Sequence, residues 1–284
     1  MPEGDTLARI AHVLGRVLAG QEVTAARGGP GGAHLARVVG QHIDNVEARG
    51  KHLLIDFSNG LTLHTHLGLH GSWHRYRPGE RWHARADRAV AIIETPVQVA
   101  VCFDAPTVEL IETRAVDIHP GLARLGSDVA RDTFDPAKAL LALRDPSRAA
   151  AAVGDALLDQ RAVAGLGNVY RSELCFLERV NPFTPLREVT DETLTKMLVR
   201  GAKLTRANSR GGARITTTAG TPGNTYVYGR TGRPCRRCGT RILSAVTRAP
   251  WSDLPRRVYW CPACQAAPDA TASVGTARSR ESRP

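Results

Sequence analysis

The chain has 284 residues, 42% of them hydrophobic and 5% aromatic, a composition and length that suit a globular protein of two domains. No stretch approaches the roughly 18–20 apolar residues of a membrane span, and no basic segment followed by a long apolar one marks a secretory signal, so we expect an intracellular protein. The 38 lysines and arginines exceed the 27 acidic residues by 11, which favours a polyanionic partner such as nucleic acid.

Residues 1–120 are predicted to form a β-sandwich with an attached helix. The segment DTLARIAHVLGRVLAG has apolar residues at helical spacing and ends at Gly20. Seven short apolar or alternating runs follow, separated by Gly, Asn, Asp and Pro, as is typical of antiparallel strands. They are VEARG, KHLLIDFSNG, LTLHTHLGL, GSWHRY, AVAIIET, VQVAVCFD and TVELIE.

The second half is predicted to be mainly helical, which makes the fold class α+β. A turn-rich linker spans 121–134, and helical patterns fill 135–227 in FDPAKALLALRD, AAVGDALLDQRAVAG, VYRSELCFLERV and TDETLTKMLVRGAKLTRA. One helix is expected to end at GLGN and the next to begin at VYRSE. Gly165 and Gly167 can adopt left-handed conformations there, and the amides that follow, with Asn168, would form a nest for an anion. A simple turn between helices fits the pattern equally well.

Basic residues are concentrated in the last third of the chain. Between residues 228 and 265 there are eight arginines and one acid, and between 196 and 214 six basic residues and no acid. Lys196, Arg200 and Lys203 would share one side of a helix. Such a run is often only a solvated face, but two of them favour contact with phosphates.

Four of the six cysteines form a predicted metal site in a β-hairpin over 228–266. Cys235, Cys238, Cys261 and Cys264 follow the spacing C-x2-C-x22-C-x2-C, which favours one structural zinc ion over disulfides inside a cell. TRILSAVTRAP and RRVYWC supply the two strands. Cys102 and Cys175 are expected to be buried and unreactive. Residues 267–284 are predicted to be a disordered tail.

Six stretches occur in a definite order between residues 2 and 265: PEGDT, ARGKHLL, HLGLHG, LLDQRAVAGLGNVY, YGRTGRPCRRCG and YWCPACQ. Together they resemble the formamidopyrimidine-DNA glycosylase and endonuclease VIII family. The resemblance implies a helix-two-turns-helix domain and a zinc hairpin. It also implies a bifunctional DNA glycosylase and abasic-site lyase of base excision repair, acting on double-stranded DNA with oxidised bases or abasic sites. We expect a cytoplasmic, nucleoid-associated monomer with no membrane partner.

The resemblance assigns catalysis to Pro2, Glu3 and Lys51. In this family the N-terminal proline attacks the damaged nucleotide, which requires removal of Met1, because an acylated nitrogen is not nucleophilic. A free α-amino group has a pKa of about 7.7–8.0, against about 10.4 for lysine, so far more of it is neutral at pH 7. Glu3 matches the glutamate that protonates O4′ of the sugar and relays protons. Lys51 matches the lysine that binds phosphate beside the lesion.

Further DNA contacts are implied for Asn168 in the helical junction and Arg256 in the hairpin. Arg257 adjoins Arg256, so which of the two makes the main phosphate contact is open. An enzyme that acts on a base must take it out of the stack and fill the space left behind. HLGLHG matches the family's void-filling loop, with Leu69 as wedge and His70 as stacking partner, although an alternating strand would also explain Leu69 as a core residue.

Two further interpretations complete the prediction. A histidine-metal site at His64, His66, His70 and His74 is disfavoured because no carboxylate or cysteine accompanies these residues in the sequence, and a structural or DNA-facing role is preferred. The stretch FDAPTVELIETR replaces the DPRRFG-like element of the family's oxidised-purine branch, so the chain resembles the endonuclease VIII branch, which prefers oxidised pyrimidines. An oxidised-purine glycosylase and a non-catalytic zinc-hairpin protein that binds damaged DNA are the alternatives.

Overall fold

The computed structural model describes residues 1–29, 34–251 and 254–267. The predicted tail lies outside this part of the chain, apart from Ala267. The α-helices are α1 Gly4–Leu18, α2 Pro136–Leu143, α3 Val153–Ala156, α4 Asn168–Leu177 and α5 Asp191–Ser209. Short 3-10 helices are η1 Leu35–Val38, η2 Ala86–Arg88, η3 Thr113–Ile118, η4 Pro146–Arg148 and η5 Leu186–Glu188. The strands are β1 Ala25–Gly28, β2 Ile43–Arg49, β3 His52–Phe57, β4 Leu61–His66, β5 Ser72–Tyr76, β6 Ala89–Glu94, β7 Val99–Phe103, β8 Thr107–Glu112, β9 Ser127–Asp128, β10 Val163–Ala164, β11 Leu243–Thr247 and β12 Arg256–Trp260.

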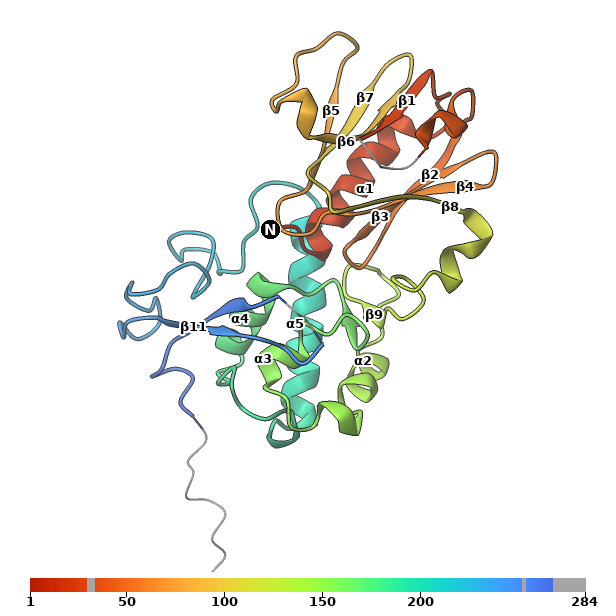
Figure 1. Cartoon of the computed structure of the whole chain (residues 1–284). Helices are drawn as coiled ribbons and strands as arrows, with labels where there is room; N and C mark the ends of the chain where they lie inside the picture. Colours follow the sequence, from red (N-terminus) through yellow and green to blue (C-terminus); the bar gives the residue numbers. More distant parts are fainter. Residues whose placement is uncertain (30–33, 252–253, 268–284) are drawn as a thin grey trace, which may run out of the picture.

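The first part of the chain is the predicted β-sandwich with its helix. Two antiparallel sheets, with strand orders β1-β6-β7-β5 and β2-β3-β4-β8, enclose one hydrophobic core (Figure 1). Helix α1 contributes Leu7, Leu14 and Leu18 to that core, because spacings of seven and four residues place them on one face. All seven predicted strands are present, and β1 is an additional strand that pairs with β6.

The outer face of the β2-β3-β4-β8 sheet is also covered. Helix η3 and the residues after it lie over this face, where Val116 and Leu122 pack on Leu54 of β3. Strand β4 is therefore buried on both sides, which explains why polar residues such as Thr62 and His64 are buried along with its leucines.

The second part is helical, and its helices begin where the sequence supplies caps. Asp135 accepts hydrogen bonds from the amides of Ala137 and Lys138 at the start of α2, and Thr190 accepts one from Thr193 at the start of α5. Helices α2, α4 and α5 share a core of their own, and α5 also contacts α1 of the first part. Within the described residues, no helix is long and apolar enough to cross a membrane.

The prediction of a long helix over AAVGDALLDQRAVAG is wrong. Only Val153–Ala156 is helical, and Val163–Ala164 instead forms β10, which pairs in parallel with β9. Asp159 is the physical reason, because its side chain accepts a hydrogen bond from the Arg161 amide at 3.1 Å. This local bond competes with helical hydrogen bonding and turns the chain.

The C-terminal hairpin consists of β11 and β12, close to the two predicted strands. Its cysteine-bearing end forms a small hydrophobic cluster in which Phe176 of α4 meets Tyr226, Val227 and Ile242. Cys102 and Cys175 are fully buried in the two main cores, as expected.

Candidate active site

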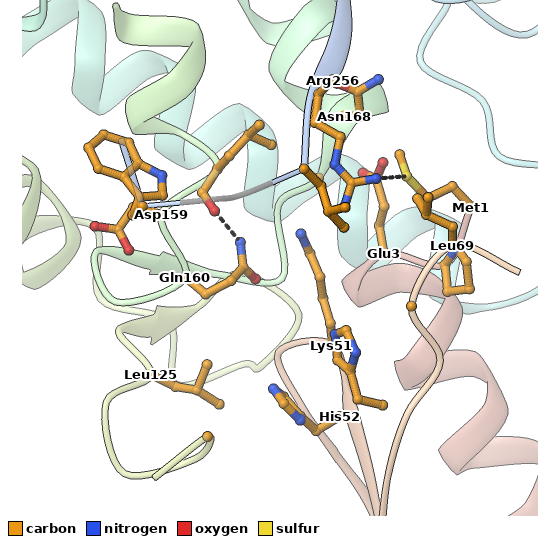
Figure 2. Close-up of a pocket in the computed structure, with 18 of the residues that line it drawn as sticks. Met1, Glu3, Lys51, His52, Leu69, Leu125, Asp159, Gln160, Asn168 and Arg256 are labelled. Carbon is orange, nitrogen blue, oxygen red and sulfur yellow. Dashed lines mark hydrogen bonds between the residues drawn. The ribbon is translucent and has the colours of Figure 1, made fainter. Parts of the chain in front are cut away.

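A cavity of about 1200 Å³ lies where the sandwich, the helical part and the hairpin meet. Figure 1 places the N-terminus at this junction, and Figure 2 shows the residues that line the cavity. The structure brings together there seven residues that the sequence singles out, although they come from five separate segments: Pro2, Glu3, Lys51, Leu69, His70, Asn168 and Arg256.

The start of the chain is fixed against the GLGN segment. The Gly4 amide donates a hydrogen bond to the carbonyl of Gly165 at 2.8 Å, and a Cβ atom on Gly4 would lie only 2.9 Å from the Gly165 Cα atom. Gly165 has a φ of +92°, which favours glycine. These glycines therefore allow two backbones to touch and hold Pro2 at the cavity wall.

Glu3 is fully buried at the N-terminus of α4. Its Oε1 atom accepts a hydrogen bond from the Val169 amide at 2.8 Å, and its Oε2 atom one from the Tyr170 amide at 3.4 Å. Burial raises the pKa of Glu3, while the positive charges of Arg214 and Lys51 act in the opposite direction. The protonated acid consequently persists to higher pH than in an exposed glutamate.

The second glycine of GLGN, Gly167, is required because Glu3 lies against it. A Cβ atom at Gly167 would lie 2.7 Å from the Glu3 Oε1 atom. Gly167 is not left-handed, so of the two glycines only Gly165 adopts the expected conformation. The predicted anion nest is in fact occupied by the protein's own carboxylate, which takes up the first free amides of α4.

Lys51 enters the cavity from the turn between β2 and β3. Gly50 has a φ of +58°, and its amide donates a hydrogen bond to the Asp128 carboxylate at 2.7 Å, which ties the turn to the linker. Burial lowers the pKa of Lys51 to about 8; Glu3 opposes this shift and Arg256 adds to it. Lys51 is thus a cation whose charge a bound phosphate would stabilise.

Sequence reasoning missed an ion pair that holds this end of the cavity. Arg214 donates to both oxygens of Asp5, from Nε at 2.6 Å and from Nη2 at 2.5 Å, and its Nη1 atom lies 3.8 Å from Glu3 Oε1. The Tyr170 hydroxyl also donates to Asp5, at 3.1 Å. The only sequence signal was an acid directly after PEG, since 209 residues separate Asp5 from Arg214.

The hairpin is fixed to α4 by buried polar contacts. Arg171 is fully buried and pairs with Asp155 at 2.7 Å, while its Nη2 atom donates to the Arg256 carbonyl at 3.2 Å. Asn168 donates to the carbonyl of Arg257 at 2.9 Å. The side-chain amide of Asn168 thus positions the hairpin, and Asn168 also lines the cavity.

The two adjacent arginines of the hairpin differ in direction. The Arg256 side chain lines the cavity, and its Nη1 atom lies 3.8 Å from the sulfur of Met1 (Figure 2). Arg257 points elsewhere and donates to the Ser244 hydroxyl at 3.2 Å. The geometry favours Arg256 as the arginine that faces a ligand.

Leu69 and His70 lie on the loop between β4 and β5, at the edge of the cavity. The loop is tight, because the Gly71 amide donates to the Leu67 carbonyl at 2.8 Å and Gly68 has a φ of +59°. Leu69 is 37% exposed, so it is not the core residue that strand alternation also allowed.

The predicted basic face of α5 is partly neutralised. Lys196 forms an ion pair with Glu192 at 2.7 Å, and Arg200 pairs with Glu178. The exposed Lys196–Glu192 pair contributes little stability, but both pairs reduce the positive charge available to phosphates.

The four predicted cysteine ligands are brought together at the far end of the hairpin. The Sγ atoms of Cys235, Cys238, Cys261 and Cys264 all lie within 4.8 Å of one another. This cluster could hold a metal ion, and it is separate from the cavity residues.

Comparison with known proteins agrees with this arrangement. The family description "Formamidopyrimidine-DNA glycosylase N-terminal domain" matches residues 1–104, and "Formamidopyrimidine-DNA glycosylase H2TH domain" matches residues 125–218. A solved complex of Lactococcus lactis Fpg (MutM) with DNA containing N7-benzyl-Fapy-dG superimposes with a TM-score of 0.78, covering 94% of this chain and 100% of that one. At 22% identity it shows the shared fold.

Two sequence relatives cover almost the whole chain. A protein named probable endonuclease 8 2 of Streptomyces coelicolor is 39% identical and covers 94% of this chain and 95% of its own length. A protein named DNA-(apurinic or apyrimidinic site) lyase Nei2 of Mycolicibacterium smegmatis is 35% identical, covering 94% of this chain and 100% of its own. The chain belongs to the formamidopyrimidine-DNA glycosylase and endonuclease VIII family and falls in its endonuclease VIII branch.

Proposed function

We propose that this protein is a bifunctional DNA glycosylase and abasic-site lyase of base excision repair that uses Pro2 as its nucleophile. The observation that carries the proposal is the meeting of Pro2, buried Glu3 and Lys51 in one cavity at the junction of the two parts. The names of the relatives, endonuclease 8 and abasic-site lyase, support the same activity.

Pro2 acts after removal of Met1, when its ring nitrogen is a free secondary amine. The amine forms a bond to C1′ of the deoxyribose as a proton from Glu3 allows the C1′–O4′ bond to break, and the amine gives up its own N–H proton. The damaged base then leaves with the electron pair of its bond to C1′ and takes up a proton, which yields an iminium ion that has no nitrogen proton to release and so keeps its charge. This charge acidifies the C2′ proton, and elimination expels the 3′ phosphate and then the 5′ phosphate.

Glu3 and Lys51 have complementary roles in this reaction. Glu3, whose pKa is raised by burial, donates a proton to O4′ and opens the ring, then relays protons during elimination. Lys51 binds a phosphate beside the lesion, and the negative charge of that phosphate would stabilise its protonated form. Burial shifts both pKa values toward the neutral forms, as is common for ionisable groups at functional sites.

The remaining cavity residues hold the DNA. Arg256 and Asn168 contact the backbone, and the exposed Leu69 and His70 occupy the space that the damaged base leaves when it rotates out of the duplex. Because most of this contact is with phosphates, affinity should fall steeply with salt.

One structural zinc ion fits the cysteine cluster. Tetrahedral Zn²⁺ with bonds of about 2.3 Å to sulfur requires sulfurs about 3.8 Å apart. The Cys235–Cys264 and Cys238–Cys261 sulfur distances are 4.0 and 3.5 Å. Four thiolates leave no open position, so the ion would fold the hairpin that carries Arg256 and take no part in the reaction.

Covalent trapping tests the nucleophile. Protein whose mass begins at Pro2 should form a borohydride-stable adduct with a duplex containing one abasic site. A matched protein with one extra residue ahead of Pro2 should bind the same duplex and form no adduct, because its Pro2 nitrogen is an amide. Absence of an adduct from the processed protein would refute the lyase mechanism and leave a non-catalytic protein that binds damaged DNA.

Oxidised pyrimidines are the proposed substrates. The support is the endonuclease 8 relatives and the FDAPTVELIETR stretch, which contains β8 and lacks the purine branch's element. We expect kcat/KM on an oxidised pyrimidine to exceed that on an oxidised purine by about tenfold or more in otherwise identical duplexes. The reverse ratio would assign the enzyme to oxidised purines while leaving the reaction unchanged.

A further inference from the structure

A second group of metal-ligand side chains lies on the outer face of the β2-β3-β4-β8 sheet, away from the cysteines. His64 of β4 stands directly opposite Glu109 of β8, and His119 follows helix η3, which covers this face. One ligand atom from each of the three lies within 4.8 Å of the others. The expectation that no carboxylate accompanies the histidines is therefore wrong for His64, because strand pairing supplies Glu109 from 45 positions later in the chain.

His64 has an unsatisfied nitrogen that points into this group. The residue is 99% buried, with 1% of its surface exposed, and its Nδ1 atom makes no hydrogen bond although Glu109 Oε2 is 3.5 Å away. A buried polar atom without a partner is costly, and in native proteins it commonly marks the place of an ion or a water molecule.

The other nitrogen of His64 determines where its lone pair lies. Nε2 is 2.8 Å from Nδ1 of His52, so one of these two nitrogens carries the proton that they share. If His64 Nε2 carries the proton and donates it to His52, the Nδ1 lone pair of His64 faces the carboxylate of Glu109. Two electron-rich atoms then face each other, an arrangement that a cation between them makes favourable. Ligand histidines usually donate their second N–H to a neighbour in this way.

We propose that His64, Glu109 and His119 form a second metal site, which binds a zinc-like divalent ion through two imidazoles and one carboxylate. Two nitrogen ligands disfavour magnesium and calcium, which prefer oxygen, and suit zinc or another late first-row metal. A bound ion would join β4 and β8 to the segment after η3. Because His52 contacts His64 and also lines the cavity beside Lys51, a bound ion would also restrict the motion of the cavity wall.

The site should bind more weakly than the four cysteines. His119 donates from Nε2 to Glu109 at 2.9 Å and accepts from the Gly121 amide at Nδ1, at 3.2 Å. Ligation through Nε2 would displace its proton to Nδ1 and break the bond with Gly121. The Glu109 and His119 side chains are 44% and 19% exposed, so both can move to accommodate the ion.

Metal counting tests the proposal independently of activity. Cobalt(II) should bind the intact chain at two ions per molecule: one with the strong sulfur-to-metal absorption of thiolate ligands, and one with only weak absorption from nitrogen and oxygen ligands. Glu109→Gln and His119→Gln should each bind one ion and keep the thiolate spectrum, which also verifies that the variants are folded.

His83→Gln is the matched control. His83 and His74 have ring centroids 3.9 Å apart, but they belong to no three-ligand group within the described residues. This variant should still bind two ions. The proposal is overturned if the unaltered chain saturates at one ion, or if a second ion persists in both Glu109→Gln and His119→Gln.

Discussion

Glu3→Gln is expected to reduce the rate of base excision by about 10²- to 10⁴-fold, the usual contribution of a positioned acid. Glutamine has the shape of glutamate and can still accept the hydrogen bond from the Val169 amide, so the fold of this region should persist. It has no acidic proton to deliver to O4′. Single-turnover excision of an oxidised base, with enzyme in excess, measures this step directly.

The pH dependence separates loss of the acid from general damage. Burial raises the pKa of Glu3, so the active, protonated form is present below that pKa and is lost as the pH rises through it. The excision rate of the unaltered enzyme should therefore decrease as the pH rises through this range. The excision rate of Glu3→Gln should not change over the same range. On a duplex with a preformed abasic site, part of which is already an open-chain aldehyde, the variant should still give a borohydride adduct. Excision at the original rate would exclude Glu3 as the acid.

Asp155→Ala is expected to lower the free energy of unfolding by about 3–5 kcal/mol, the cost of leaving a buried charge without its partner. Arg171 is fully buried, and the Asp155 carboxylate is 2.7 Å from its guanidinium group. The same carboxylate accepts from the Thr247 hydroxyl of β11 at 3.0 Å, so the variant also loosens the hairpin. Chemical denaturation measures the stability, and anisotropy on an abasic-site duplex measures the weakened binding.

A second substitution shows how much of the lost stability comes from the unpaired charge of Arg171. Adding Arg171→Met to Asp155→Ala removes the unpaired cation and should restore much of the stability. DNA affinity should stay low, because the contact from Arg171 to the Arg256 carbonyl is also lost. A loss below about 1 kcal/mol in the single variant would match an exposed ion pair and contradict the structural role assigned to Asp155.

The strands and the cysteine cluster could be predicted from the sequence, because local patterns and motif spacing encode them. Alternating runs identified the seven strands, and cysteine spacing predicted the cluster, because both depend on residues close together in the chain. Contacts between distant segments were missed. Asp5 meets Arg214 across 209 residues, and Glu109 meets His64 only through the register of β4 with β8.

Glycines and short polar residues account for the other differences. In GLGN the sequence correctly indicated an unusual backbone, but the cause is close contact with Gly4 and Glu3 and not an external anion. Asp159 ended a helix that apolar periodicity favoured, because one side-chain hydrogen bond outweighed weak propensities. In GLGN the deciding partners lie in the distant N-terminal segment, whereas at Asp159 the deciding contact is a local side-chain hydrogen bond that apolar periodicity does not detect.

The contact between Gly4 and Gly165 also sets an order of events during synthesis. Glu3 receives its amide partners only from residues 166 and 167 positions further along the chain. At about 5–20 residues per second, the ribosome needs roughly 8–33 s to make that stretch. During this interval Glu3 lacks its amide partners, and in the complete protein Met1 lies against Arg256 in the cavity. We therefore expect removal of Met1 to have its best opportunity before the C-terminal half exists, so that Pro2, the proposed nucleophile, is released before its site has formed.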